Sequence, residues 1–169
     1  VGTSLAAGAF CEFTVTNWIE GDYAGPDHNN LFTAHAEDND ETDVEDSDDA
    51  TVVFTNVAPS IEVTKTANPT SVPETGGNVD FTFKVLNTSA EELVTITSLT
   101  DNVFGTLTGD SDCQVGTSLA AGAFCEFTVT KNISGDYPDS HVNVFTAHAQ
   151  DNEGTDATDT DDATVTFTD

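Results

Sequence analysis

Apolar and polar residues alternate at every second position in several short segments of the chain. The clearest segment covers residues 79–85, where Val79, Phe81, Phe83 and Val85 alternate with polar side chains. A period of two is typical of a half-buried β-strand. The same pattern predicts strands at residues 61–64, 93–99, 104–107, 125–129, 142–149 and 163–167. No segment has a plausible helical period, so we predict an all-β chain.

Segments rich in Gly, Pro, Asn and Asp separate the predicted strands and are expected to form turns or loops. They cover residues 67–77, 87–92 and 109–122. Seven or so short strands divided by such turns indicate an antiparallel β-sandwich. Residues 57–169 are long enough to form one such sandwich with its own core.

A long internal repeat sets the domain organisation. The segment VGTSLAAGAFCEFTVT occurs at residues 1–16 and again, unchanged, at 115–130, and residues 32–55 resemble 145–168. We therefore predict a complete repeat at 57–169 and the C-terminal half of another, carrying its last three strands, at 1–56. Such repeats form tandem arrays, so we expect a segment of a longer one. The same long chain, or strand exchange from a neighbouring chain, would complete the partial repeat.

The charge balance narrows the classes of partner. The chain has 31 acidic residues against 3 lysines and no arginine, a formal net charge of −28. Nucleic-acid binding is excluded because no basic patch exists to neutralise phosphates. The excess of carboxylates indicates either bound divalent cations or a saline medium, and the alternative for most of them is a plain solvated surface. No apolar stretch in this sequence is long enough to span a bilayer.

Three cysteines suggest an oxidising compartment. Cys113 and Cys125 flank a Gly-rich turn and are expected to form a local disulfide, with two reduced, buried thiols as the alternative. Cys11 is equivalent to Cys125, and its partner would fall two places before Val1. Glycosylation triplets at Asn87 and Asn132 also fit an exported protein.

Three motifs together resemble a known family. They are SIEVTKTANPTSVPETGGNVDFTFKVLNTS, then VTITSLTDNVFG, and finally TDDATVTFT. The chain resembles the DUF11-like conserved repeats of bacterial and archaeal surface proteins over residues 57–169, and residues 1–56 resemble the second half. The resemblance implies tandem immunoglobulin-like antiparallel β-sandwiches, one complete and one partial, at an extracellular or cell-surface location. It brings no catalytic residues.

An acidic segment precedes the last predicted strand of each repeat and is expected to be a loop. Calcium takes roughly six to eight oxygen ligands from flexible segments, which clustered carboxylates can supply. We expect calcium as the cofactor, with Asp101 completing the site at the same end of the sandwich. A mobile, solvated acidic loop is the alternative. The candidate ligands are Asp101, Asp151, Asn152, Asp156, Asp161 and Asp162 in the complete repeat, and Asp38, Asn39, Asp43, Asp48 and Asp49 in the partial one.

These observations favour a structural function. We expect a segment of a large exported surface or filament protein, whose modules act as a stalk, fibre or adhesin spacer. Its expected partners are neighbouring repeats of the same long chain or other copies in a fibre. The alternatives are an adhesion module that binds a carbohydrate or protein, and a fibre subunit completed by strand exchange. We do not expect an enzyme, because no nucleophile motif such as GxSxG occurs.

Overall fold

The computed structural model describes residues 2–169 of the chain. Within these residues the chain is all-β, with no helix and 52% strand, which confirms the predicted class. No helix in the described part is long and apolar enough to cross a membrane. The chain divides into two compact units, which we call unit 1 (residues 1–56) and unit 2 (residues 57–169).

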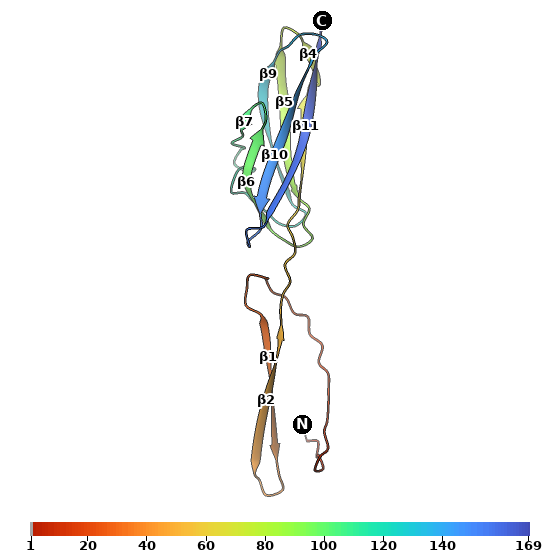
Figure 1. Ribbon diagram of the computed structural model, residues 1–169, viewed down its shortest axis with the longest axis vertical. Helices are drawn as coiled ribbons and strands as arrows, with labels where there is room; N and C mark the ends of the chain where they lie inside the picture. Colours follow the sequence, from red (N-terminus) through yellow and green to blue (C-terminus); the bar gives the residue numbers. More distant parts are fainter. Residues whose placement is uncertain (1) are drawn as a thin grey trace. The chain divides into compact units, whose positions relative to one another are not determined.

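Unit 2 contains two sheets that enclose a common core (Figure 1). One sheet has the strand order β3–β5–β9, and the other has the order β4–β11–β10–β6–β7 with β8 paired to β6. The strands are β3 Ile61–Asn68, β4 Ser71–Pro73, β5 Gly77–Asn87, β6 Val94–Asp101, β7 Gly105–Thr106, β8 Ser118–Leu119, β9 Phe124–Ile133, β10 Ser140–Gln150 and β11 Asp156–Thr168.

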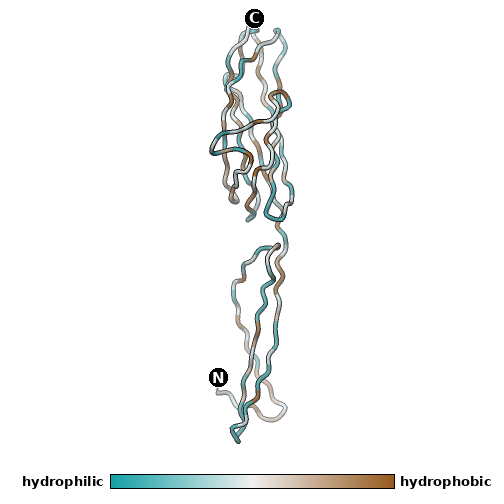
Figure 2. Tube along the Cα trace, turned by 90° about the vertical axis from the view of Figure 1, so that its left-hand side faces the viewer, coloured by the Kyte–Doolittle hydropathy of each residue, from teal (hydrophilic) through white to brown (hydrophobic). Residues whose placement is uncertain are grey.

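The core of unit 2 follows from the alternation in the sequence, because each long strand buries every second side chain. Figure 2 shows apolar and polar residues interspersed along the strands. Phe83 of β5 stacks on Phe127 of β9, with ring centroids 5.0 Å apart, and meets Phe145 of β10 edge-on at the same distance. These aromatic contacts join the two sheets and supply much of the buried apolar area.

The acidic segment of unit 2 differs from the prediction. It was expected to be a loop, but β11 begins at Asp156, so residues 156–162 continue the last strand and only 151–155 form a turn. Ala157 and Ala163 are buried on the inner face of β11, and Asp159 and Asp161 between them point the same way. The carboxylates are tolerated there because they find hydrogen-bond donors on β3, as described below.

Unit 1 contains an antiparallel hairpin of β1 His28–Glu37 and β2 Asp43–Val52 (Figure 1). Its register repeats that of β10 and β11, since His28 faces Val52 as His141 faces Val165. The third strand expected in this unit is absent from its described residues, 2–56. The equivalent strand in unit 2, β9, pairs only with β5, and the part of unit 1 that the structure describes contains no counterpart of β5.

Candidate functional site

Two inward-facing aspartates of β11 bind the backbone of β3. Asp159 Oδ2 accepts a hydrogen bond from the Val63 amide at 2.8 Å, and Asp161 Oδ2 accepts one from the Lys65 amide at 2.7 Å. Strand β3 is an edge strand of its sheet, so amides on its outer side have no neighbouring strand to bind. The two carboxylates therefore cap this edge and connect the two sheets through charge-assisted hydrogen bonds.

The turns before the last strands also use their aspartates locally. Asp151 Oδ1 accepts a hydrogen bond from the Thr155 amide at 2.7 Å. In unit 1 the equivalent Asp38 accepts bonds from the amides of Asp40 and Thr42 at 2.8 and 2.9 Å. The bonds from Thr42 and Asp40 hold the pKa of Asp38 below its usual value. Backbone amides thus stabilise the carboxylates that open each acidic segment.

The structure places the predicted calcium ligands along the whole acidic segment. Asp101 on β6 and Asp161 on β11 face the same residue of β10, Phe145, whereas Gln150, next to the acidic turn, faces Thr95 at the other end of β6. Asp101 therefore lies level with the far end of the acidic segment, and its part in a calcium site stays a prediction. Asp161 is bound to β3. Residues 2–169 contain no group of three or more His, Cys, Asp or Glu side chains suited to a metal ion.

The other calcium candidates occupy the turns and the acidic strands. Asp151 and Asn152 lie in the turn, Asp156 and Asp162 lie on β11, Asp38 and Asn39 lie at the turn of unit 1, and Asp43, Asp48 and Asp49 lie on β2. Calcium at these residues stays a prediction. Comparing the melting temperature in calcium and in chelator tests it, and equal values would contradict it.

A fully buried polar cluster in unit 2 was not predicted. The side chains of Lys65 on β3 and Asp101 on β6 are both 0% exposed, and Lys65 Nζ donates to Asp101 Oδ2 at 2.6 Å. Asn143 on β10 is also 0% exposed, and its Nδ2 donates to the same Asp101 oxygen at 2.9 Å. Lys65 Nζ also donates to the backbone carbonyl of Asn143 at 2.8 Å. The carboxylate therefore contacts both the amine and the side-chain amide, and the amine also contacts the backbone of Asn143.

The surroundings of the cluster are aromatic. The rings of Phe81, Phe83 and Phe104 have centroids 5.5, 5.4 and 5.6 Å from Lys65 Nζ. These faces attract a cation and exclude water. Burial lowers the pKa of Lys65, and the contact with Asp101 offsets only part of that effect. A charged lysine in such a pocket is costly unless its partner stays in place.

Backbone amides bind the second oxygen of the Asp101 carboxylate. Asp101 Oδ1 accepts hydrogen bonds from the amides of Val103 and Phe104, both at 2.9 Å. Burial raises the pKa of Asp101, but the bonds from Lys65, from these amides and from Asn143 outweigh it and leave the pKa below its usual value. In contrast, Asn143 Oδ1 is buried and has no hydrogen-bond partner among the described residues.

The sequence does contain a signal for this cluster. Lys65 continues the inward register of Ile61 and Val63, and Asn143 continues that of Phe145 and Ala147. A polar or charged residue at an inward position of a strand is informative, since lysine is almost never fully buried without a partner. The period-two alternation of apolar residues alone does not mark these two positions, because both are polar.

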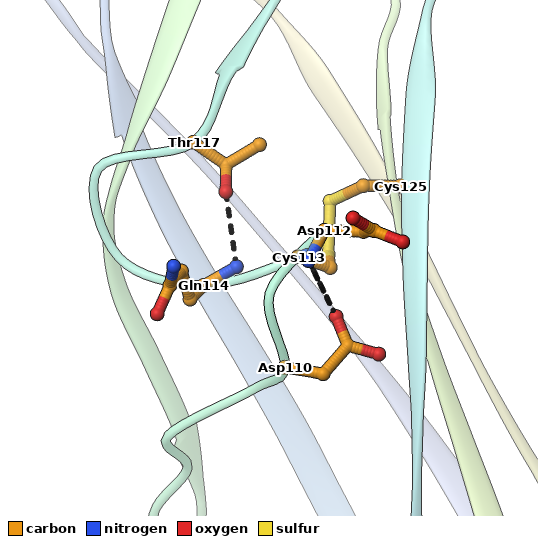
Figure 3. Close-up of a disulfide and its surroundings, with 6 residues drawn as sticks. All are labelled: Asp110, Asp112, Cys113, Gln114, Thr117 and Cys125. Atoms are coloured by element: carbon orange, nitrogen blue, oxygen red, sulfur yellow. Dashed lines mark hydrogen bonds between the residues drawn. A yellow bond between two sulfur atoms is a disulfide. The ribbon is translucent and has the colours of Figure 1, made fainter.

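The three cysteines and the two glycosylation triplets differ in their bonding and exposure. Cys113 and Cys125 are bonded, and beside them Asp110 Oδ1 accepts a hydrogen bond from the Cys113 amide at 2.9 Å (Figure 3). Cys11 is an exposed free thiol. Asn87 is fully buried and donates from Nδ2 to two backbone carbonyls, so a glycan does not fit there in the folded protein, whereas Asn132 is exposed.

Unit 1 exposes residues whose equivalents form the core of unit 2. Phe32 is 54% exposed and its equivalent Phe145 is 0% exposed; Phe13 is 70% exposed and its equivalent Phe127 is 3% exposed. An open groove of about 740 Å³ runs between residues 10–15 and the hairpin. The inner face of the hairpin in unit 1 is therefore an uncovered core surface.

The chain matches no model of a known protein family and no curated protein. Its structure contains a buried amine–carboxylate–amide cluster, a disulfide and an open hairpin.

Proposed function

We propose that this chain is a structural segment of an exported cell-surface or filament protein, built from tandem immunoglobulin-like β-sandwiches. The strongest support is that the same hairpin occurs twice, once covered by other strands and once uncovered. In unit 2 the hairpin β10–β11 is covered by β3, β5 and β9, and in unit 1 the equivalent hairpin β1–β2 has an open inner face. A hairpin of this kind is stable only when further strands cover its apolar face.

The occupant we propose for the open face is the first half of another repeat of the same kind. In unit 2 the carboxylates of Asp159 and Asp161 bind the amides of β3. Their equivalents in unit 1, Asp46 and Asp48, are exposed on β2. They are placed to bind a strand like β3 in the same register, so docking by strand addition follows the contacts already present in unit 2.

A disulfide-forming fragment tests this docking. We would mix the full chain with a polypeptide of residues 57–114, which carries Cys113. If the fragment covers unit 1 as its counterpart covers unit 2, its Cys113 meets Cys11 and a mixed disulfide forms under mild oxidation. Phe32→Asp places a charge on the inner face and should abolish the mixed disulfide, whereas the matched Thr33→Asp on the outer face should not. Equal yields from the two variants would contradict docking on this face.

Location is tested separately. The disulfide Cys113–Cys125 supports an oxidising compartment. Antibodies raised against the full chain should label intact cells of the source organism or filaments released from them. Label confined to the interior of permeabilised cells would contradict the proposed surface role. This outcome is independent of whether unit 1 is completed by the same polypeptide or by a neighbour.

A further inference from the structure

The buried cluster of Lys65, Asp101 and Asn143 brings an amine and a side-chain amide to one carboxylate oxygen. Two nitrogens, Lys65 Nζ and Asn143 Nδ2, donate to one oxygen of Asp101 at 2.6 and 2.9 Å. Lys65 Nζ also contacts the backbone carbonyl of Asn143, so the amine lies against the residue whose side-chain amide it would attack. We propose that Lys65 and Asn143 form an intramolecular isopeptide bond, with Asp101 as the catalytic residue that transfers protons.

The first step is a proton transfer along an existing hydrogen bond. The ammonium of Lys65 passes a proton to Asp101 Oδ2, which leaves a neutral amine and a carboxylic acid. Water stabilises the ion pair in solution, and the rings around Lys65 keep water out, so the neutral pair is more accessible than at a surface. Burial acts in the same direction by lowering the pKa of Lys65, whereas the hydrogen bonds to Asp101 lower the pKa of Asp101 and oppose the transfer. Fixed neighbours also hold the reactants in place without a loss of entropy during the reaction.

The second step forms and breaks one bond each. The lone pair of Lys65 Nζ attacks Asn143 Cγ, and the carbonyl electrons move onto Oδ1. Asp101 carries two protons in turn from Nζ to Nδ2, the Cγ–Nδ2 bond breaks, and ammonium leaves. Asp101 ends as a carboxylate, so its role is that of a general base and acid. The products are a secondary amide and one ammonium ion, and no oxidant or other reactant is required.

Asn143 is a better electrophile here than Asp101. Amide formation at Asp101 would expel its oxygen as water, and this oxygen would need an acid to protonate it. The described partners of the Asp101 carboxylate are Lys65, Asn143 and the amides of Val103 and Phe104, with no second carboxyl among them. Asn143 Nδ2, the nitrogen that must leave, already donates a hydrogen bond to Asp101. Asn143 Oδ1 accepts no hydrogen bond from the described residues, so none stabilises the amide in its present form.

The bond would change how unit 2 carries force. It would join β3 in one sheet to β10 in the other. A pull on residues 57 and 169 would then pass through the bond, and residues 66–142 would carry none of the tension. The inference does not depend on the proposed surface role, although resistance to extension would suit it.

Intact-mass spectrometry of the reduced, denatured full chain is the test. We expect a mass below that of the sequence by one ammonia, about 17 Da, and a proteolytic peptide that joins Lys65 to Asn143. A full sequence mass would overturn the proposal. A loss of one water, about 18 Da, with Lys65 joined to Asp101 would overturn the assignment of Asn143.

Variants assign the roles. Lys65→Met and Asn143→Ala should restore the full mass, and Lys84→Met, the same substitution at a partly exposed lysine on β5, should retain the loss. Asp101→Asn keeps the shape and removes the proton carrier, so it should also restore the full mass while the circular dichroism spectrum stays native. If this variant fails to fold, the unchanged chain still decides the question, because its own mass must show the loss. A linked peptide in a folded Asp101→Asn variant would contradict the catalytic role of Asp101.

Discussion

The inward-facing aspartates of β11 are expected to stabilise unit 2, although they repel one another. Neighbouring carboxylates of the acidic segment repel one another, so on repulsion alone the removal of one should stabilise the protein or leave its stability unchanged. In the structure Asp161 Oδ2 accepts a hydrogen bond from the Lys65 amide at 2.7 Å. Asp161→Ala leaves that amide without its acceptor. We therefore expect the substitution to destabilise unit 2.

The magnitudes decide which effect dominates. A hydrogen bond to a charged group contributes about 1.5–3 kcal/mol. The nearest carboxylate on the same face, Asp159, is two residues away, about 6.6 Å along a strand. Repulsion at that separation is worth about 0.6 kcal/mol in water, and salt reduces it further. The net expectation is a loss of about 1–2.5 kcal/mol, with Asp161→Asn intermediate because a neutral oxygen can still accept the bond.

The assay is urea denaturation followed by far-ultraviolet circular dichroism. Values of m for domains of this size are about 1–3 kcal/mol per molar urea, so the midpoint should fall by about 1 M. The repeat supplies the matched control, since Asp48→Ala removes the same charge at the equivalent position of unit 1, where Asp48 is exposed. It should leave the midpoint unchanged or raise it. Stabilisation by Asp161→Ala, or equal effects of the two substitutions, would refute the reasoning.

Three further predictions concern the core, the disulfide and acid stability. Phe127→Ala should cost about 3–5 kcal/mol because the ring is 3% exposed, whereas Phe13→Ala, at the equivalent position with 70% exposure, should stay within about 0.5 kcal/mol; equal midpoints in urea would contradict this. Reduction of Cys113–Cys125, which are 12 positions apart, should destabilise unit 2 by about 3 kcal/mol in denaturant titrations with and without reductant, and an unchanged midpoint would count against it. Burial lowers the pKa of His141 below 6.5, so the stability due to its neutral form is complete above that pH and is lost on acidification. Between about pH 7.5 and about pH 5.5 the melting temperature should therefore fall less in His141→Gln than in the unchanged protein, and equal falls would exclude this role.

The period-two pattern predicted most of the long strands of unit 2 because burial of alternate side chains is a local property of the sequence. It did not predict β4 or β8, which have three and two residues and depend on pairing with distant strands. The acidic segment was misassigned for a related reason. Whether Asp159 repels its neighbours or caps an edge depends on the position of Val63, which is 96 residues away in the chain.

The contacts within the buried cluster also join residues that are far apart in the chain, so local sequence patterns do not predict them. Lys65 and Asp101 are 36 positions apart, and Asp101 and Asn143 are 42 positions apart. The register of each strand could have marked these residues as inward-facing polar positions. Only the packing of the two sheets brings the three together, so their mutual contact, and the chemistry that follows from it, required the structure.

Asn30 in unit 1 is equivalent to Asn143 and is exposed on β1. The partners of Asn143 lie on β3 and β6, and residues 2–56 form no counterpart of either strand. A strand of the β3 type, docked on β2 in the register that Asp46 and Asp48 define, would bring its own lysine to Asn30. The segment that covers the open face would thus also supply the nucleophile. Docking of strands alone is reversible, but an amide bond at this position would make the closure of unit 1 permanent. A unit closed in this way would carry tension through that bond, whether the completing strand came from the same polypeptide or from a neighbouring one.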